Sequence, residues 1–147
     1  MSLRFPLVLS VLFSLLLCGC STLTEFVIVN STDKPVTVRL VFTGNNHDTF
    51  KTSTTAQLEE SDKKWNDLSA EEVQFDEENR AYTLSLPADH ALLVTTEINC
   101  SGHEHELFPI SEIVLSQDED VKKFEDKSAQ LAFKTKKNGS YRLLYRP

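Results

Sequence analysis

The sequence predicts an all-β fold, an antiparallel β-sandwich of about eight strands with one short helical insertion. Three observations predict it. Short runs of β-branched and aromatic residues recur along the chain, turn residues separate them at intervals of roughly 8–12 residues, and an Asn-Gly pair divides the last two runs. This pattern is typical of a sandwich of the immunoglobulin or transthyretin kind, and it argues against a parallel α/β sheet.

The first two expected strands, Glu25–Asn30 and Val36–Thr43, flank the turn cluster at residues 31–35, so we expect them to form a hairpin. A short strand is expected at Thr49–Thr54. By the two-residue period, one face of the second strand carries only apolar side chains and should face the core: Val36, Val38, Leu40 and Phe42.

Residues 56–70 lack β character and are expected to form the helical insertion, with an ordered acidic loop as the alternative. Leu58, Trp65 and Leu68 would lie near one another on a helix of 3.6 residues per turn. Glu59 and Glu60 near the start of this segment suit the positive end of the helix dipole.

The second half of the chain continues with short strands. Val73–Phe75 and Arg80–Leu86 should form a hairpin with Tyr82, Leu84 and Leu86 facing the core, and Ala129–Thr135 should pair with Ser140–Arg146 across Asn138-Gly139. Pro109 marks an edge or a bend, which favours two packed sheets over a closed barrel. The other expected strands are Ala91–Asn99, Leu107–Ser116 and Val121–Phe124.

The chain begins with a segment typical of a signal peptide. Arg4 supplies a positive start, and residues 5–17 are almost wholly apolar, a run shorter than the roughly 20 residues that a spanning helix needs. Leu17-Cys18-Gly19-Cys20 resembles the lipobox of bacterial lipoproteins, in which a branched apolar residue and two small residues precede the acceptor cysteine. An ordinary secretory signal cut near Gly19 is the alternative.

The lipobox resemblance implies that residues 1–19 are removed and that Cys20 carries a diacylglyceryl group on its sulfur and an acyl chain, such as palmitate, on its amine. Ser21 implies an outer-membrane location, facing the periplasm. Removing 19 of the 147 residues leaves 128, which fits a single domain over residues 20–147. Its 14 basic and 22 acidic side chains give a net charge of −8, which argues against nucleic-acid binding and leaves membrane attachment to the acyl chains.

Cys100 has no partner for a disulfide, because Cys18 leaves with the leader and Cys20 carries the lipid. Cys100, His103 and His105 gather one thiolate and two imidazole ligands in a C-x2-H-x-H pattern, which suits Zn or Cu. A solvated polar loop is the simpler alternative, so no cofactor is expected beyond the covalent lipid. No enzymatic activity is expected either, since the chain has no G-x-S-x-G motif and only four glycines.

Charge is unevenly distributed along the chain. Residues 59–78 hold nine acidic and two basic side chains, whereas residues 134–147 hold five basic and no acidic ones. An aromatic residue among charges can anchor an interface, which makes the stretch around Trp65, with Glu59, Glu60 and Asp62, a candidate contact surface. The alternative is an ordinary solvated surface.

These observations predict a non-enzymatic, lipid-anchored envelope protein, a binding or structural accessory domain at the outer membrane with an envelope protein as its partner. Three alternatives remain open. One is a periplasmic metal or small-ligand binder that uses the Cys100/His103/His105 loop. Another is an accessory lipoprotein of a secretion machine, since Pro35–Leu40 is similar to an early strand of type VI secretion lipoproteins. The third is an inhibitor of a cell-wall hydrolase.

Overall fold

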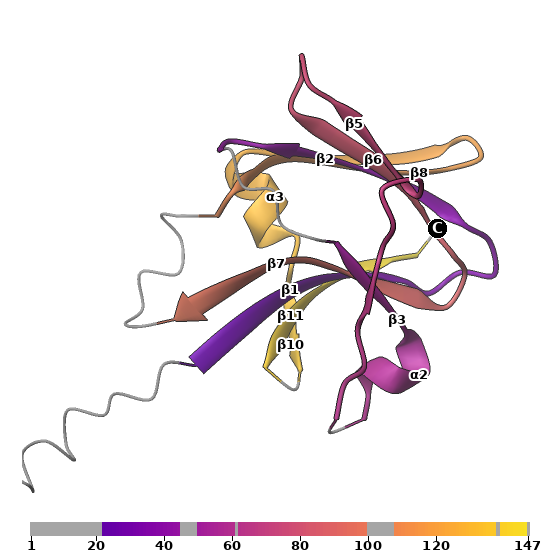
Figure 1. The fold of residues 1–147 in the computed structure, drawn as a ribbon, viewed down its shortest axis with the longest axis vertical. Coiled ribbons are helices and arrows are strands. Elements are labelled where there is room, and N and C mark those ends of the chain that lie inside the picture. The colour runs from indigo at the N-terminus through magenta and orange to yellow at the C-terminus, as the bar shows by residue number, and fades with distance from the viewer. Residues whose placement is uncertain (1–21, 45–49, 61, 100–107, 138, 147) are drawn as a thin grey trace, which may run out of the picture.

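The computed structural model describes residues 22–44, 50–60, 62–99, 108–137 and 139–146. Within them the chain is all-β, and its strands form two mostly antiparallel sheets packed face to face (Figure 1). The predicted sandwich is therefore confirmed, although the described residues form eleven strands where about eight were expected.

The first sheet has six strands in the order β10-β11-β1-β7-β3-β4. Their bounds are β10 Thr135–Lys137, β11 Ser140–Tyr145, β1 Thr22–Asn30, β7 His90–Asn99, β3 Lys51–Thr54 and β4 Asn66–Asp67. The second sheet has five strands in the order β5-β6-β2-β8-β9. Their bounds are β5 Val73–Asp76, β6 Ala81–Leu86, β2 Val36–Phe42, β8 Ile110–Gln117 and β9 Asp120–Glu125. Two short helices, α2 (Thr55–Leu58) and α3 (Lys127–Leu131), complete the described elements.

The first and last strands lie side by side in the middle of the six-stranded sheet. β1 pairs in parallel with β11, with Val27 opposite Arg142, and it pairs antiparallel with β7 on its other side. Because β1 has a neighbour on both sides, its backbone groups are used in two ladders. The N-terminal strand is thus a central element of the fold.

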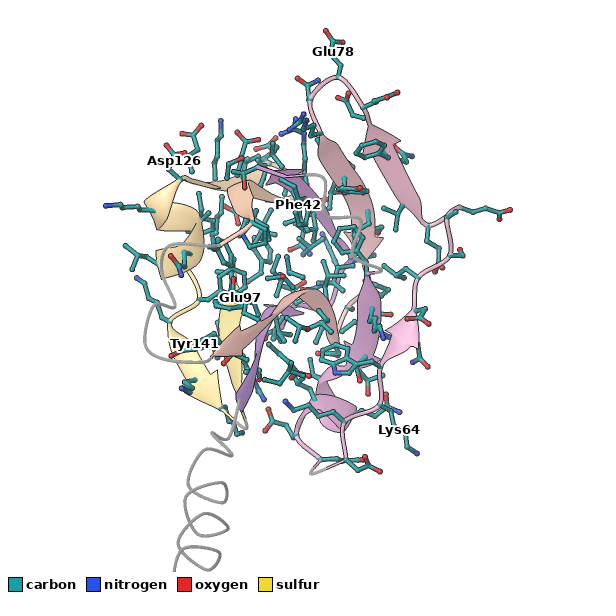
Figure 2. The ribbon with its side chains drawn as sticks, turned by 60° about the vertical axis from the view of Figure 1, so that its left-hand side comes forward. Phe42, Lys64, Glu78, Glu97, Asp126 and Tyr141 are labelled. Carbon is teal, nitrogen blue, oxygen red and sulfur yellow. The ribbon has the colours of Figure 1, made fainter. Side chains whose placement is uncertain are left out.

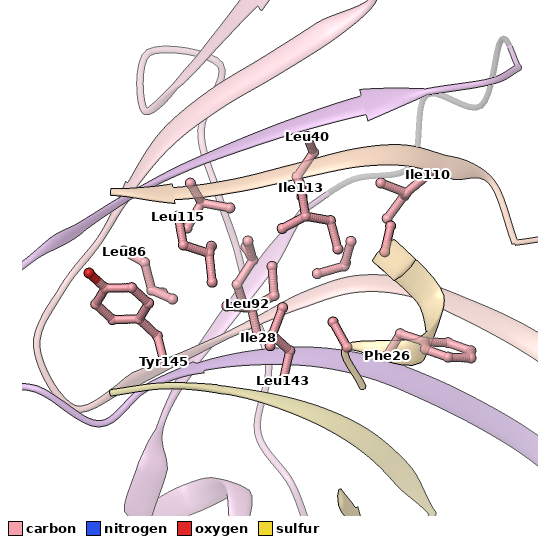
Figure 3. Packing of buried hydrophobic residues seen from close by; sticks show 14 of the residues in the cluster. Phe26, Ile28, Leu40, Leu86, Leu92, Ile110, Ile113, Leu115, Leu143 and Tyr145 are labelled. Atoms are coloured by element: carbon pink, nitrogen blue, oxygen red, sulfur yellow. The ribbon is translucent and has the colours of Figure 1, made fainter. Parts of the chain in front are cut away.

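The main core lies between the two sheets (Figure 3). β2 alternates as predicted, since its four core-facing residues (Val36, Val38, Leu40 and Phe42) are all buried. Leu84 and Leu86 of β6 are also buried, and Tyr82 packs against the same cluster. Burial of side chains of this size stabilises the fold by about 1.5–3 kcal/mol each.

β1 is buried on both of its faces. Phe26 and Ile28 belong to the core between the sheets, whereas Val27 and Val29 belong to a second cluster with Leu58 and Ala91. Leu58 is the last residue of α2, so this helix covers part of the outer face of the six-stranded sheet. The continuous apolar run of β1 follows from this double burial.

The predicted hairpin of Glu25–Asn30 with Val36–Thr43 is wrong, because β1 and β2 belong to different sheets. The Asn30 side chain explains the crossing between them. Its amide is fully buried, donates to the carbonyl oxygens of Lys34, Leu86 and Pro87, and accepts from Thr32. It therefore holds the turn against the end of β6 in the opposite sheet.

The helix predicted over residues 56–70 is mostly wrong. Thr54 and Gln57 form a capping box that starts α2, but the helix ends at Leu58. Beyond it, Trp65 packs on the outer cluster and Leu68 packs on the main core, two places that one face of a helix could not reach. The strand predicted at Ala129–Thr135 is also wrong except at Thr135, because α3 extends to Leu131 and buries Ala129, and β10 begins only at Thr135.

The predicted hairpin of Val73–Phe75 with Arg80–Leu86 is confirmed, since β5 pairs with β6. The last predicted hairpin is present with a different first strand: β11 pairs with β10, which begins at Thr135, where the predicted strand ends. Gly139 has φ of +76°, a backbone conformation that glycine adopts without strain. Pro109 directly precedes β8, and its carbonyl accepts from the backbone N–H of Thr43, which ties the start of β8 to the end of β2.

Asn30→Ala should lower the free energy of unfolding by about 1–3 kcal/mol, because it leaves buried carbonyl oxygens without donors. Denaturant titration would measure this change. Asn79→Ala is the matched control, since Asn79 is exposed and its side chain donates to Asp76 across their own turn; it should cost less than about 0.5 kcal/mol. Equal losses in the two variants would contradict the role given to Asn30.

Tyr145 gives a second test of the packing. Its side chain is fully buried and its hydroxyl donates to Asp120 Oδ2 at 2.7 Å, which joins β11 to β9 across the sandwich. Burial, followed by this hydrogen bond, raises the pKa of Tyr145 to about 12. A raised pKa means that Tyr145 stabilises the fold fully below its unfolded pKa of about 10 and that this contribution is lost as the pH rises towards 12.

Tyr145→Phe should therefore lose less stability than the unsubstituted chain when the pH is raised from 10 to 12, as measured by denaturant titration at each pH. Tyr141→Phe, on the same strand but only half-buried, should keep the full alkaline loss. An unchanged alkaline loss in Tyr145→Phe would contradict the assignment.

Candidate functional site

The residues singled out from the sequence as sites, Cys20, Cys100, His103 and His105, lie outside the described residues. Lipidation and metal binding therefore stay predictions. In the described part of the chain, no three His, Cys, Asp or Glu side chains are grouped so as to hold a metal ion. The same residues include no helix that is long and apolar enough to cross a membrane.

A groove on the outer face of the six-stranded sheet is the candidate site among the described residues. It encloses about 560 Å³. Residues of α2 line one side, residues of β10 line the other, and β11 lies between these two elements. Val29 and Leu144 give it an apolar part, and its charged side chains come from four separate segments. These charged residues are Glu59, Asp89, Lys137, Arg142 and Arg146.

Arg142 is the most unusual residue of this groove, because only 5% of it is exposed. Its Nη1 donates to Glu59 Oε1, and its Nε donates to Ser140 Oγ at 3.4 Å. Its Nη2 is buried and has no hydrogen-bond partner among the described residues. Arginine stays charged at any ordinary pH, so the groove holds a buried cation with spare donors.

Glu59 lies opposite this cation, directly after α2, and 43% of its side chain is exposed. One carboxylate oxygen pairs with Lys137 and the other with Arg142. The hydrogen bond from Lys137, followed by that from Arg142, holds the pKa of Glu59 below its usual value. The acidic and basic stretches noted in the sequence thus meet in space at this ion pair.

The acidic stretch does not form a single surface. Glu78, at the tip of the β5–β6 hairpin, and Lys64, after α2, lie at opposite ends of the molecule (Figure 2). Trp65 is half-buried against the outer cluster, and its Nε1 donates to Glu25 Oε1 at 3.3 Å. Lys63 pairs with the other oxygen of Glu25 at 2.6 Å. Trp65 therefore contributes to internal packing through its buried part, and the contact surface around it stays a prediction.

Sequence reasoning missed Arg142. The available signal was its position between Ser140 and Leu144 on one face of a strand whose other residues are mostly apolar. A charged residue in such a strand indicates a specific partner. That partner, Glu59, lies 83 residues away, and no local pattern identifies it.

Comparisons with protein-family models, with curated proteins and with solved structures return no match. The groove is therefore interpreted from its own chemistry. A buried guanidinium beside a lysine and a second arginine is suited to hold carboxylates.

Glu59→Gln should lower the free energy of unfolding at neutral pH, and that free energy should fall less between pH 7 and pH 3 than it does in the unsubstituted chain. Because the pKa of Glu59 is depressed in the fold, its contribution is present above the unfolded pKa and is lost as the pH falls through the folded value. The variant lacks this contribution at every pH. Denaturant titration followed by fluorescence of Trp65, the single tryptophan, at pH 7 and at pH 3 would measure the difference.

Glu60→Gln is the matched control, because Glu60 is an exposed carboxylate in the same turn. Its stability and acid dependence should stay close to those of the unsubstituted chain. The ion-pair assignment fails if the Glu59 and Glu60 variants behave alike.

Proposed function

We propose that this chain is a lipid-anchored envelope protein, non-enzymatic, that serves as a binding or structural accessory domain on the periplasmic side of the outer membrane. The observation that carries this proposal is the distance in sequence between the lipobox and the fold. β1 begins at Thr22, so Ser21 alone separates it from Cys20. An acylated Cys20 would hold the domain directly against the lipid.

The position of β1 supports anchoring through Cys20, which lies two residues before the strand begins. β1 is paired on both sides and buried on both faces, so a force applied at Cys20 would act on the centre of a six-stranded sheet. Leu23, three residues after Cys20, is 59% exposed. An apolar side chain in that position can share the apolar environment of the acyl chains.

A binding role is supported by the other end of the same strand. At roughly 3.3 Å per residue, the nine residues of β1 extend for about 30 Å. The groove includes Val29 near the far end of β1, together with Ser31 and Arg146 beyond the ends of β1 and β11. The lining also includes Lys137, which lies level with Glu25 near the start of β1, so the groove runs along most of this strand. A domain anchored at Cys20 would hold this groove at a high local concentration near the membrane.

Cys20→Ser should abolish lipid labelling and release the chain from the membrane, because position 20 then has no sulfur to carry the diacylglyceryl group. The measurement is metabolic labelling of the full chain with an alkyne fatty acid, together with separation of membrane and soluble fractions. Acyl anchoring by two or three chains predicts a nearly complete shift to the soluble fraction.

Cys18→Ser is the matched control, since it removes a neighbouring thiol and keeps a small residue before Gly19. It should be labelled and retained in the membrane. Retention of unlabelled Cys20→Ser in the membrane fraction would refute anchoring through Cys20.

A further inference from the structure

The guanidinium of Arg142 is incompletely used within the described structure. Glu59 binds it through one oxygen and gives the other oxygen to Lys137, so the carboxylate does not form the bidentate pair that arginine favours. Nη2 keeps its donors buried without a partner among the described residues. A buried donor without an acceptor is costly, and an acceptor that reaches it is stabilised accordingly.

The groove also has more positive charges than carboxylates to neutralise them. Among the described residues, its lining contains three cationic side chains, Lys137, Arg142 and Arg146, against the two carboxylates of Glu59 and Asp89. This local excess of positive charge occurs in a chain with a formal net charge of −7. An anion is therefore attracted to the groove although the protein as a whole repels it.

The remaining lining restricts the shape of the ligand. Thr55, Ser31 and Thr135 offer hydroxyl groups, and Val29 and Leu144 offer apolar surface. A pocket of about 560 Å³ has the size of small-ligand sites. The lining thus suits a small ligand that carries a carboxylate, an apolar group for Val29 and Leu144, and amide groups that can bond to the hydroxyls.

We propose that the groove between α2 and β10 binds a carboxylate-bearing ligand through Arg142, Lys137 and Arg146, and that Glu59 is an internal carboxylate which the ligand displaces. Glu59 is suited to leave, because it lies at the end of a single helical turn and nearly half of its side chain already meets solvent. Arg142 is suited to stay, because it is almost fully buried. This inference goes beyond the anchoring function and holds whether or not Cys20 carries lipid.

A purely structural role for Arg142, in which it only fastens α2 to the sheet, makes a different prediction. In that case Glu59→Gln weakens the fold and creates no binding. Displacement predicts that the same substitution weakens the fold but strengthens binding of an added carboxylate, because the internal competitor has lost its charge. The two roles are therefore separated by whether Glu59→Gln strengthens carboxylate binding.

The test is a titration of the purified full chain, labelled with ¹⁵N and held in non-ionic detergent, monitored by NMR at the Arg142 Nε–H signal. The probes are acetate, N-acetyl-Ala-Ala with a free carboxylate, and N-acetyl-Glu-amide. N-acetyl-Ala-Ala-amide is the control that lacks the charge. We expect a saturable shift with the carboxylates and none with the amide.

Glu59→Gln should bind the preferred carboxylate about tenfold more tightly. Arg142→Gln, which lacks the side-chain signal and is followed at the backbone N–H signals of the groove residues, should bind it about tenfold more weakly. Lys137→Gln and Arg146→Gln should weaken binding as well, and they supply the test if Arg142→Gln does not fold. Arg39→Gln is the matched control, because Arg39 forms an ion pair with Glu112 in the other sheet. It should leave the affinity unchanged.

The probes also identify the source of the carboxylate. Tighter binding of N-acetyl-Ala-Ala indicates a peptide C-terminus, tighter binding of N-acetyl-Glu-amide indicates an acidic side chain, and equal binding of acetate indicates a small free acid; each outcome supports the proposal. It is overturned if no carboxylate gives a saturable shift in a folded Glu59→Gln chain, or if the amide binds equally well. Neither result bears on whether Cys20→Ser leaves the membrane.

Discussion

The structure depends on the burial of β1 on both of its faces. Phe26 and Ile28 complete the core between the sheets, and Val27 and Val29 require a second cover on the outside. A strand of this kind is stable only in the middle of a sheet and under an additional layer. Its placement between β7 and β11, and the return of the last strand to lie parallel beside it, follow from that requirement.

The outer cover explains the groove. Leu58 and Trp65 bring the segment from α2 to β4 over Val27 and Val29, but this cover is narrow and leaves part of β11 beside it. Arg142 and Glu59 close the gap between the cover and the sheet with an ion pair. Arg142 is almost fully buried in this pair, whereas Glu59 is nearly half exposed. Burying a charged side chain contributes little net stability compared with apolar packing, which is consistent with the ligand role proposed for Arg142.

Local patterns in the sequence predicted those parts of the fold that local physics determines. The alternation of Val36, Val38, Leu40 and Phe42 placed one face of β2 in the core, and Asn138-Gly139 placed the last hairpin. Local patterns could not show that β1 and β2 belong to different sheets. The crossing between them is held by hydrogen bonds from Asn30 to Leu86 and Pro87, which lie 56 and 57 positions further along the chain. The groove was missed for the same reason, since Arg142 meets Glu59 only through the fold.

The proposed anchor at Cys20 and the groove are connected through β1. Val27 lies directly opposite Arg142 in the parallel pairing of β1 and β11, only seven residues from Cys20 along the chain. Only Ser21 lies between Cys20 and β1. An acylated Cys20 would therefore keep the groove no farther from the bilayer than about the length of β1. A ligand for Arg142 would then have to come within about 30 Å of the membrane surface, which favours carboxylates carried by envelope components over solutes that diffuse freely.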